Sequence, residues 1–235
     1  DQAGPLARTV RDAALALAAM SGPDPRDATS LPQAPPDLLG PLESGVAGLR
    51  LGLLAEAESA EGGVDPDVAS ACERAARLLE SAGATLVRVS VPRVALGVAA
   101  YYVVATAEAS SNLARYDGVR FGARRDGEGP AGLFRATRTA GFGEEVKRRL
   151  LLGAFVLSAG YREAWYEKAL RVRALLSSDF ASAFRACDAI LCPTAPAPAF
   201  PLGERRSDPV ALLLGDGFTV PASLAGLPAF SVPAG

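Results

Sequence analysis

The sequence predicts an α/β fold in which helices cover a small sheet, and a strand–helix–strand unit in its first half indicates this most directly. Residues 49–54 form a short apolar run, and residues 85–91 alternate and are rich in β-branched side chains. Apolar side chains between these two runs recur at helical spacing. A unit of this length predicts two parallel strands joined by a right-handed crossover. A further apolar run at residues 188–192 predicts another strand, which Pro193 ends.

Capping residues set the start of the first two predicted helices. Thr9 precedes a run of alanine and leucine that ends before Gly22, which predicts a helix over residues 9–20. Asp65 supplies an N-cap for the helix between the first two strands, and Pro66 suits its first position because the N–H that proline lacks would have no helical partner there.

The second half of the chain is predicted to be mainly helical. Helical patterns cover residues 94–113, 144–157 and 161–187, and an arginine- and glycine-rich loop covers residues 117–132. Beyond residue 193 the prolines are too frequent for long regular elements. With 235 residues, 49% of them hydrophobic, the chain can bury the core of one α/β domain.

Composition excludes several classes of function. The chain has no histidine, which rules out Ser-His-Asp and Cys-His catalysis and histidine metal sites within this segment. A net charge of -2 provides no strong basic field for nucleic acid. Three cysteines without a C-x-x-C pair indicate reduced thiols in a cytoplasmic protein. No apolar run is expected to reach the roughly 18 residues of a membrane span, so no membrane contact is expected.

Charge is concentrated in the middle of the chain. Between Arg115 and Arg149 the sequence has nine basic and five acidic residues. A solvated surface explains such a run more simply than contact with tRNA, because charge runs usually belong to exposed faces.

Several strings resemble known sequences. Residues 1–14 and the D-P-x-D-x-T segment at 24–30 resemble amidase-signature enzymes in general. More specific strings resemble the A subunits of tRNA-dependent amidotransferases, and they lie at residues 107–118, 143–149, 157–161, 193–196 and 220–228. Together these strings cover nearly the whole chain in the same order as in the family.

The resemblance implies an amidase-signature fold, with a partial mixed sheet covered by helices. In that family a serine, a second serine with a cis peptide and a lysine hydrolyse glutamine through an acyl-enzyme. These three residues lie upstream of the string that begins at residue 1, so no catalytic residue is expected here. We therefore expect residues 1–235 to be a single incomplete domain, cut at both ends, which is inactive alone.

Four residues become candidates for a glutamine pocket by the same resemblance. Arg149 would hold the α-carboxylate, for which a guanidinium offers two parallel hydrogen bonds. Asp216 would hold the α-ammonium, and Tyr101 or Tyr102 would line the path of the side chain. The residues alone also allow simpler interpretations: a surface ion pair for Arg149, a turn at Asp216, and core aromatics for the two tyrosines.

The resemblance also implies a complex. Glutamine would be the substrate, and ammonia would pass to B-type and C-type subunits that convert Glu-tRNA(Gln) to Gln-tRNA(Gln). The tRNA would bind mainly through the partner, which would also hold ATP and Mg, so no cofactor is expected in this chain. Two alternatives stay open: a piece of a general amidase-signature amide hydrolase, and a non-catalytic interaction module.

Overall fold

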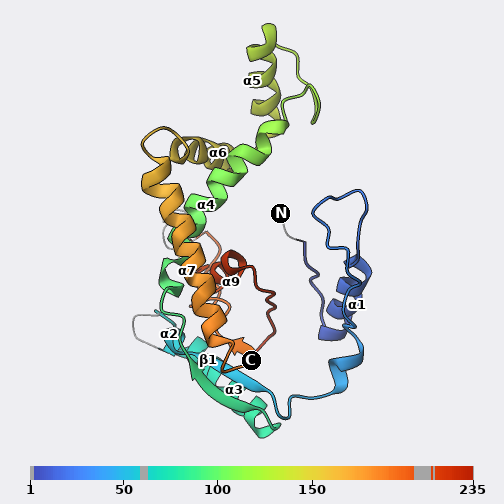
Figure 1. The fold of residues 1–235 in the computed structure, drawn as a ribbon, viewed down its shortest axis with the longest axis vertical. Helices are drawn as coiled ribbons and strands as arrows, with labels where there is room; N and C mark the ends of the chain where they lie inside the picture. The colour runs from blue at the N-terminus through green and yellow to red at the C-terminus, as the bar shows by residue number, and fades with distance from the viewer. Residues whose placement is uncertain (1–2, 59–62, 204–212, 214, 235) are drawn as a thin grey trace.

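The fold consists of a helical body with a small parallel sheet at one end (Figure 1). The structure is a computed structural model that describes residues 3–58, 63–203, 213 and 215–234. Strands β1 (Arg50–Leu54), β2 (Thr85–Val89) and β3 (Ala189–Leu191) lie in the order β2-β1-β3. β1 pairs in parallel with both neighbours. The α/β class is therefore confirmed. A mixed sheet was expected, and the strands in the described part of the chain form only its parallel pairs.

The crossover between β1 and β2 follows the sequence signals closely. α2 (Ala55–Glu58) follows β1, and α3 (Pro66–Ser81) leads to β2. The Asp65 side chain accepts a hydrogen bond of 2.9 Å from the backbone N–H of Asp67, which confirms the predicted N-cap. The predicted second strand was two residues too long, because the backbone N–H of Val91 donates to the Glu56 carboxylate at 3.0 Å instead of to a strand.

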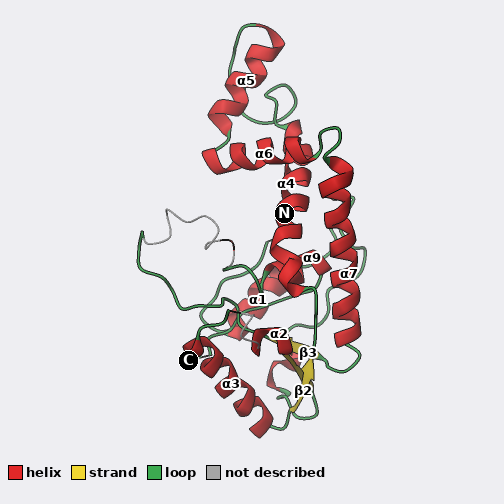
Figure 2. Cartoon of the chain, turned by 90° about the vertical axis from the view of Figure 1, so that its left-hand side faces the viewer, coloured by secondary structure: helices red, strands yellow, loops and turns green. Residues whose placement is uncertain are grey.

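α4 (Gly97–Asn112) is the central helix of the body. It packs against α6 (Glu144–Val156), α7 (Glu167–Ala183) and α9 (Val220–Ala225). Figures 1 and 2 show α4 and α7 side by side along the length of the molecule. The buried cluster joins the sheet to this body and includes Leu176 and Val91, both fully buried.

α4 and α6 approach each other closely at a glycine. A Cβ atom placed on Gly153 would lie only 1.9 Å from the carbonyl oxygen of Thr106. Only a residue without a side chain lets the two backbones meet at this distance. Gly153 therefore fixes how near α6, and every side chain on its inner face, comes to α4.

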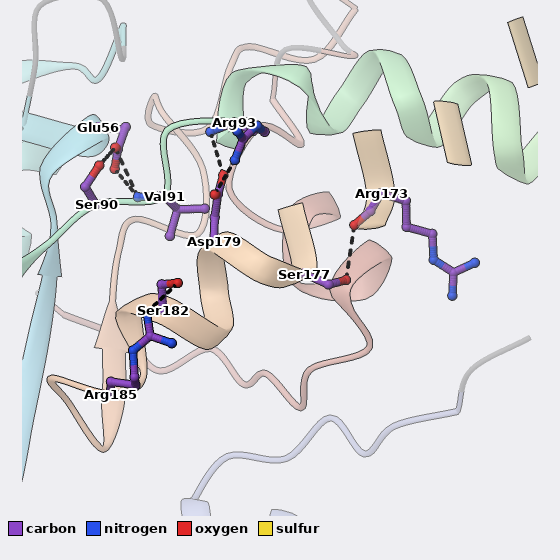
Figure 3. Close-up of polar contacts among 9 residues, drawn as sticks. All are labelled: Glu56, Ser90, Val91, Arg93, Arg173, Ser177, Asp179, Ser182 and Arg185. Atoms are coloured by element: carbon purple, nitrogen blue, oxygen red, sulfur yellow. Dashed lines mark hydrogen bonds and ion pairs between the residues drawn. The ribbon is translucent and has the colours of Figure 1, made fainter. Parts of the chain in front are cut away.

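Polar contacts tie the segment between β2 and α4 to its neighbours (Figure 3). Arg93 forms an ion pair with Asp179 of α7, whose side chain is only 12% exposed. On α7, the Ser177 hydroxyl donates to the carbonyl of Arg173 at 3.1 Å. The entry to α4 is thus anchored to α7 by charge as well as by apolar packing.

Two of the helical predictions need correction. α5 (Gly129–Gly141) begins inside the predicted loop 117–132, because Pro130 in its first turn starts a helix instead of belonging to the loop. The predicted helix over residues 161–187 is divided: a π-helical turn, Arg162–Tyr166, precedes α7. A cap at Phe184 then ends α7 before Cys187.

The expectation about apolar runs was also wrong as stated. The 22-residue segment Val94–Arg115 has a hydropathy of 1.3 in its most apolar window and is long enough, by length and composition, to cross a membrane. In this fold the segment contains α4, whose neighbours are α6, α7 and α9 of the same chain.

α1 (Val10–Met20) lies at the periphery, apart from the helical body (Figure 1). The Thr9 hydroxyl accepts a hydrogen bond of 3.1 Å from the backbone N–H of Asp12, which confirms the predicted N-cap. No residue of α1 is buried. The apolar side chains of this helix therefore find no core within the described part of the chain.

Candidate functional site

The first candidate residue, Arg149, lies on α6 and faces α4. It lies one helical turn before Gly153, so both residues are on the face of α6 that meets α4. The close approach at Gly153 brings the Arg149 guanidinium within reach of side chains on α4. The helix crossing at Gly153 thus places a cation beside two tyrosines.

Arg149 contacts three side chains at once. Its Nε donates to the Glu145 carboxylate at 2.8 Å, and its Nη1 donates to the Tyr101 hydroxyl at 3.4 Å. Its Cζ lies 5.6 Å from the centre of the Tyr102 ring, a cation–π distance. The structure therefore brings together three of the four predicted site residues, and adds Glu145 to them.

The two tyrosines present different groups to the guanidinium. Their rings meet edge to face, with centres 5.3 Å apart at 86°. Tyr101 offers Arg149 its hydroxyl, whereas Tyr102 offers it the face of its ring. Both rings are half-buried, so they form a wall that is apolar but carries polar tips.

Their hydrogen bonds keep Glu145 and Arg149 charged. Hydrogen bonds from Arg148 and then Arg149 lower the pKa of Glu145 to about 2. The bond to Glu145, followed by the bond to Tyr101, raises the pKa of Arg149 above its usual value. Since the Arg149 side chain remains 34% exposed, it is an oriented cation that an anion in solution can reach.

The simpler interpretation of Arg149 is confirmed in part. The predicted ion pair with the glutamate four residues earlier forms, between Glu145 and Arg149. Glu145 also bonds Arg148, while Glu144 pairs with Lys147 instead of with an arginine. The surface pair and the contact with Tyr101 coexist, because one guanidinium has five N–H groups to donate.

Asp216, the fourth candidate residue, lies on a different segment, which leads into α9. It lies in the turn before α9, where its backbone carbonyl accepts from the N–H of Val220 at 3.1 Å, so the predicted turn is confirmed. Its side chain is exposed. A Cβ on Gly97, the first residue of α4, would lie 2.8 Å from Pro221, so α9 touches the first turn of that helix. Within the described residues, no hydrogen bond or ion pair joins Asp216 to Arg149.

One residue that holds the Asp216 segment was missed at the sequence level. Arg173 of α7 donates from Nε to the carbonyl of Leu224, at the end of α9, at 3.0 Å. This bond satisfies a carbonyl that a helix end leaves without a partner. Nothing in the sequence around Arg173 distinguishes it from a surface arginine, because its partner is 51 residues away.

Among the described residues, no group of three or more Cys, Asp and Glu side chains is arranged to hold a metal ion. The chemistry that this geometry supports is recognition: a cation with a hydroxyl beside it on α6 and α4, and a carboxylate on the turn that leads into α9.

Comparison with known proteins shows the family of this chain. The sequence profile of the amidase family matches residues 1–235, the whole chain. The chain belongs to the amidase family. Its fold is similar to that of the A subunit of glutamyl-tRNA(Gln) amidotransferase from Thermotoga maritima, with a TM-score of 0.71 and 40% identity over 97% of this chain and 46% of that one.

Curated relatives in the amidase family agree with this likeness. The A subunit of the glutamyl-tRNA(Gln) amidotransferase of Rhodospirillum rubrum is 53% identical over all of this chain and 47% of its own length. That of Rubrobacter xylanophilus is 52% identical over all of this chain and 49% of its own length. The chain thus spans about half the length of the curated relatives it matches. A bacterial aryl acylamidase, at 22% identity and a TM-score of 0.64, shares the fold alone.

Proposed function

We propose that this chain is an incomplete amidase domain that supplies the glutamine pocket of an ammonia-producing amidotransferase subunit. The observation that carries the proposal is the Arg149 guanidinium, held by Glu145 and Tyr101 and still exposed. A planar cation fixed in this way suits the α-carboxylate of an amino acid. The likeness to amidotransferase A subunits at 53% identity supports glutamine as the amino acid.

In this proposal each candidate residue has a separate role. Arg149 binds the α-carboxylate, Asp216 binds the α-ammonium, and Tyr101 and Tyr102 guide the amide side chain toward the reaction centre. A closure of the turn before α9 would bring Asp216 to the ligand, since the α-carboxylate and the α-ammonium are attached to the same carbon and must be held side by side. Water then replaces the amide nitrogen, so that glutamine and water give glutamate and ammonia.

The reacting groups come from elsewhere in this proposal. A serine nucleophile, a second serine and a lysine would be supplied by a segment outside this sequence, so the chain alone is inactive. The ammonia would pass to B-type and C-type subunits, where ATP and Mg activate Glu-tRNA(Gln). The whole assembly would be cytoplasmic. A general amide hydrolase is the second candidate, supported by the fold that the chain shares with other amidases.

Complementation tests the proposal. This chain is co-expressed with the other segment of a relative, and ammonia release from glutamine and from simple amides is measured. Arg149→Ala and Asp216→Ala are compared with Arg148→Ala, which loses two hydrogen bonds to Glu145 but leaves the contact between Arg149 and Tyr101 in place. Glutamine turnover that only the first two variants lose supports the proposal. Turnover of simple amides alone supports the second candidate, and association without any turnover supports an interaction module.

A further inference from the structure

A part of the fold that the proposed pocket does not use extends from the end of α4. We call residues 113–142 the α5 arm: η4 (Leu113–Arg115), the loop 116–128, α5 and its C-cap Phe142. Figures 1 and 2 both show it beyond α4, at the opposite end of the molecule from the sheet. The proposed glutamine pocket is built by α4, α6 and the turn before α9, so the α5 arm needs another explanation.

The α5 arm is fastened internally. The backbone N–H of Arg125 donates to the Thr137 hydroxyl at 3.0 Å, and that hydroxyl donates back to the Arg125 carbonyl at 3.2 Å. Arg138 donates to the carbonyl of Leu113 at 2.9 Å, which ties α5 to the end of α4. A loop held by part-buried bonds of this kind keeps its shape before any ligand arrives.

An open groove of about 320 Å³ lies between the loop and α5. Its lining is mainly apolar and consists of Val119, Arg124, Gly127, Gly129, Pro130, Leu133 and Phe134. Val119 is 62% exposed and Phe134 is 39% exposed, although the groove sits on a surface rich in arginine. Large apolar side chains left exposed around a hollow are typical of a protein–protein contact.

The charge of the α5 arm is opposite to that of the rest of the chain. It contains six arginines and three acidic residues, a net charge of +3 in a chain whose net charge is -2, so the other residues together carry -5. Arg124 is paired with Asp126 at 3.0 Å. Arg125 and Arg135 are exposed and form no ion pair with another described residue. These cations are available to carboxylates on a partner.

We infer that this groove docks a protein subunit that inserts apolar side chains flanked by carboxylates. RNA would satisfy the arginines, but its phosphates would leave the apolar side chains of Val119 and Phe134 without a match. A segment that is both apolar and acidic matches both features. The choice of partner for the test rests on the proposed function: it is the pair of B-type and C-type subunits from the same source.

The test measures the affinity of the full-length protein for that pair. Val119→Asp and Phe134→Asp each place a carboxylate in the groove at an exposed position, and circular dichroism checks that both variants fold. Leu78→Asp, on α3 beside two other arginines and 70% exposed, is the matched control. We expect the dissociation constant to rise at least about tenfold for the groove variants and less than about twofold for the control. Added salt should weaken the wild-type complex.

Three results would overturn the inference: no assembly of the wild-type protein with the pair, an unchanged dissociation constant for the groove variants, or weaker tRNA binding with unchanged assembly. Amide hydrogen exchange adds a fourth. If residues 119–134 are already protected in the full-length protein alone, the groove is filled by the rest of the same chain. Glutamine hydrolysis by the full-length protein alone is measured in parallel. Its absence in the wild type would reject the proposed function, whereas the docking inference depends only on the dissociation constants.

Discussion

Replacement of Gly153 by alanine should push α6 away from α4. The new Cβ would lie 1.9 Å from the Thr106 carbonyl oxygen, whereas a close C···O contact is about 3.3 Å, so α6 must retreat by more than about 1 Å. Overpacking of this kind costs about 1–3 kcal/mol, and a rigid backbone atom places the cost near the upper end. Alanine recovers about 1 kcal/mol of helix propensity, which leaves a loss of about 2 kcal/mol in the free energy of unfolding.

Urea unfolding followed by circular dichroism measures this loss. Gly141→Ala, at the last residue of α5, is the matched control: a Cβ there meets no atom within 4 Å, so this variant should be as stable as the wild type or up to about 1 kcal/mol more stable. Since Arg149 lies one turn before Gly153, the retreat of α6 should also raise the KM for glutamine in the complete enzyme. A Gly153→Ala protein as stable as the control would refute the close crossing of α4 and α6.

Three further substitutions test separate contacts. Thr137→Val removes both bonds to the Arg125 backbone and should cost about 1–3 kcal/mol in urea unfolding, while the exposed Thr139→Val should cost almost nothing; equal stabilities would contradict the internal fastening of the α5 arm. Glu145→Gln should lower the melting temperature at pH 7. Because the pKa of Glu145 is lowered to about 2, its contribution is complete above the ordinary value of 4.5 and is lost as the pH falls toward 2, so the gap from wild type should close over that range. If the difference in melting temperature persists at pH 2, the effect of Glu145→Gln comes from packing and not from the charge. Arg173→Ala should increase amide exchange in α9 and raise the KM for glutamine more than it lowers kcat. Arg173→Lys should restore little, because lysine lacks the Nε donor that bonds the Leu224 carbonyl. Unchanged exchange in Arg173→Ala would show that Arg173 does not hold α9.

The elements that depend on local signals could be predicted from the sequence. The cap at Asp65 and the proline after it fixed the start of α3, and the alternation of the second strand fixed β2 to within two residues. The start of α5 could not be read from Gly129 and Pro130 alone, because this pair is typical of a loop and proline is equally at home in the first turn of a helix. The π-helical turn before α7 has no comparable sequence signal.

In the candidate site, too, local contacts could be predicted from the sequence and long-range contacts could not. The Glu145–Arg149 pair follows from a spacing of four on a helix. The contact between Arg149 and Tyr101 joins residues 48 positions apart and depends on the helix crossing at Gly153, which no local pattern encodes. The family resemblance identified both residues of this contact. The structure adds how Arg149 is held, and it leaves Asp216 on the neighbouring turn without a direct contact.

The role of Arg149 can be measured most directly by comparing two substrates. The complete enzyme is assayed with glutamine and with glutaminamide, which lacks the α-carboxylate, in wild type, Arg149→Ala and Arg148→Ala. A hydrogen-bonded charge contributes about 1.5–3 kcal/mol, so the wild type should prefer glutamine by about 10- to 100-fold in kcat/KM. The account predicts that Arg149→Ala loses this preference while Arg148→Ala keeps it. A preference that survives in Arg149→Ala would contradict the proposed pocket.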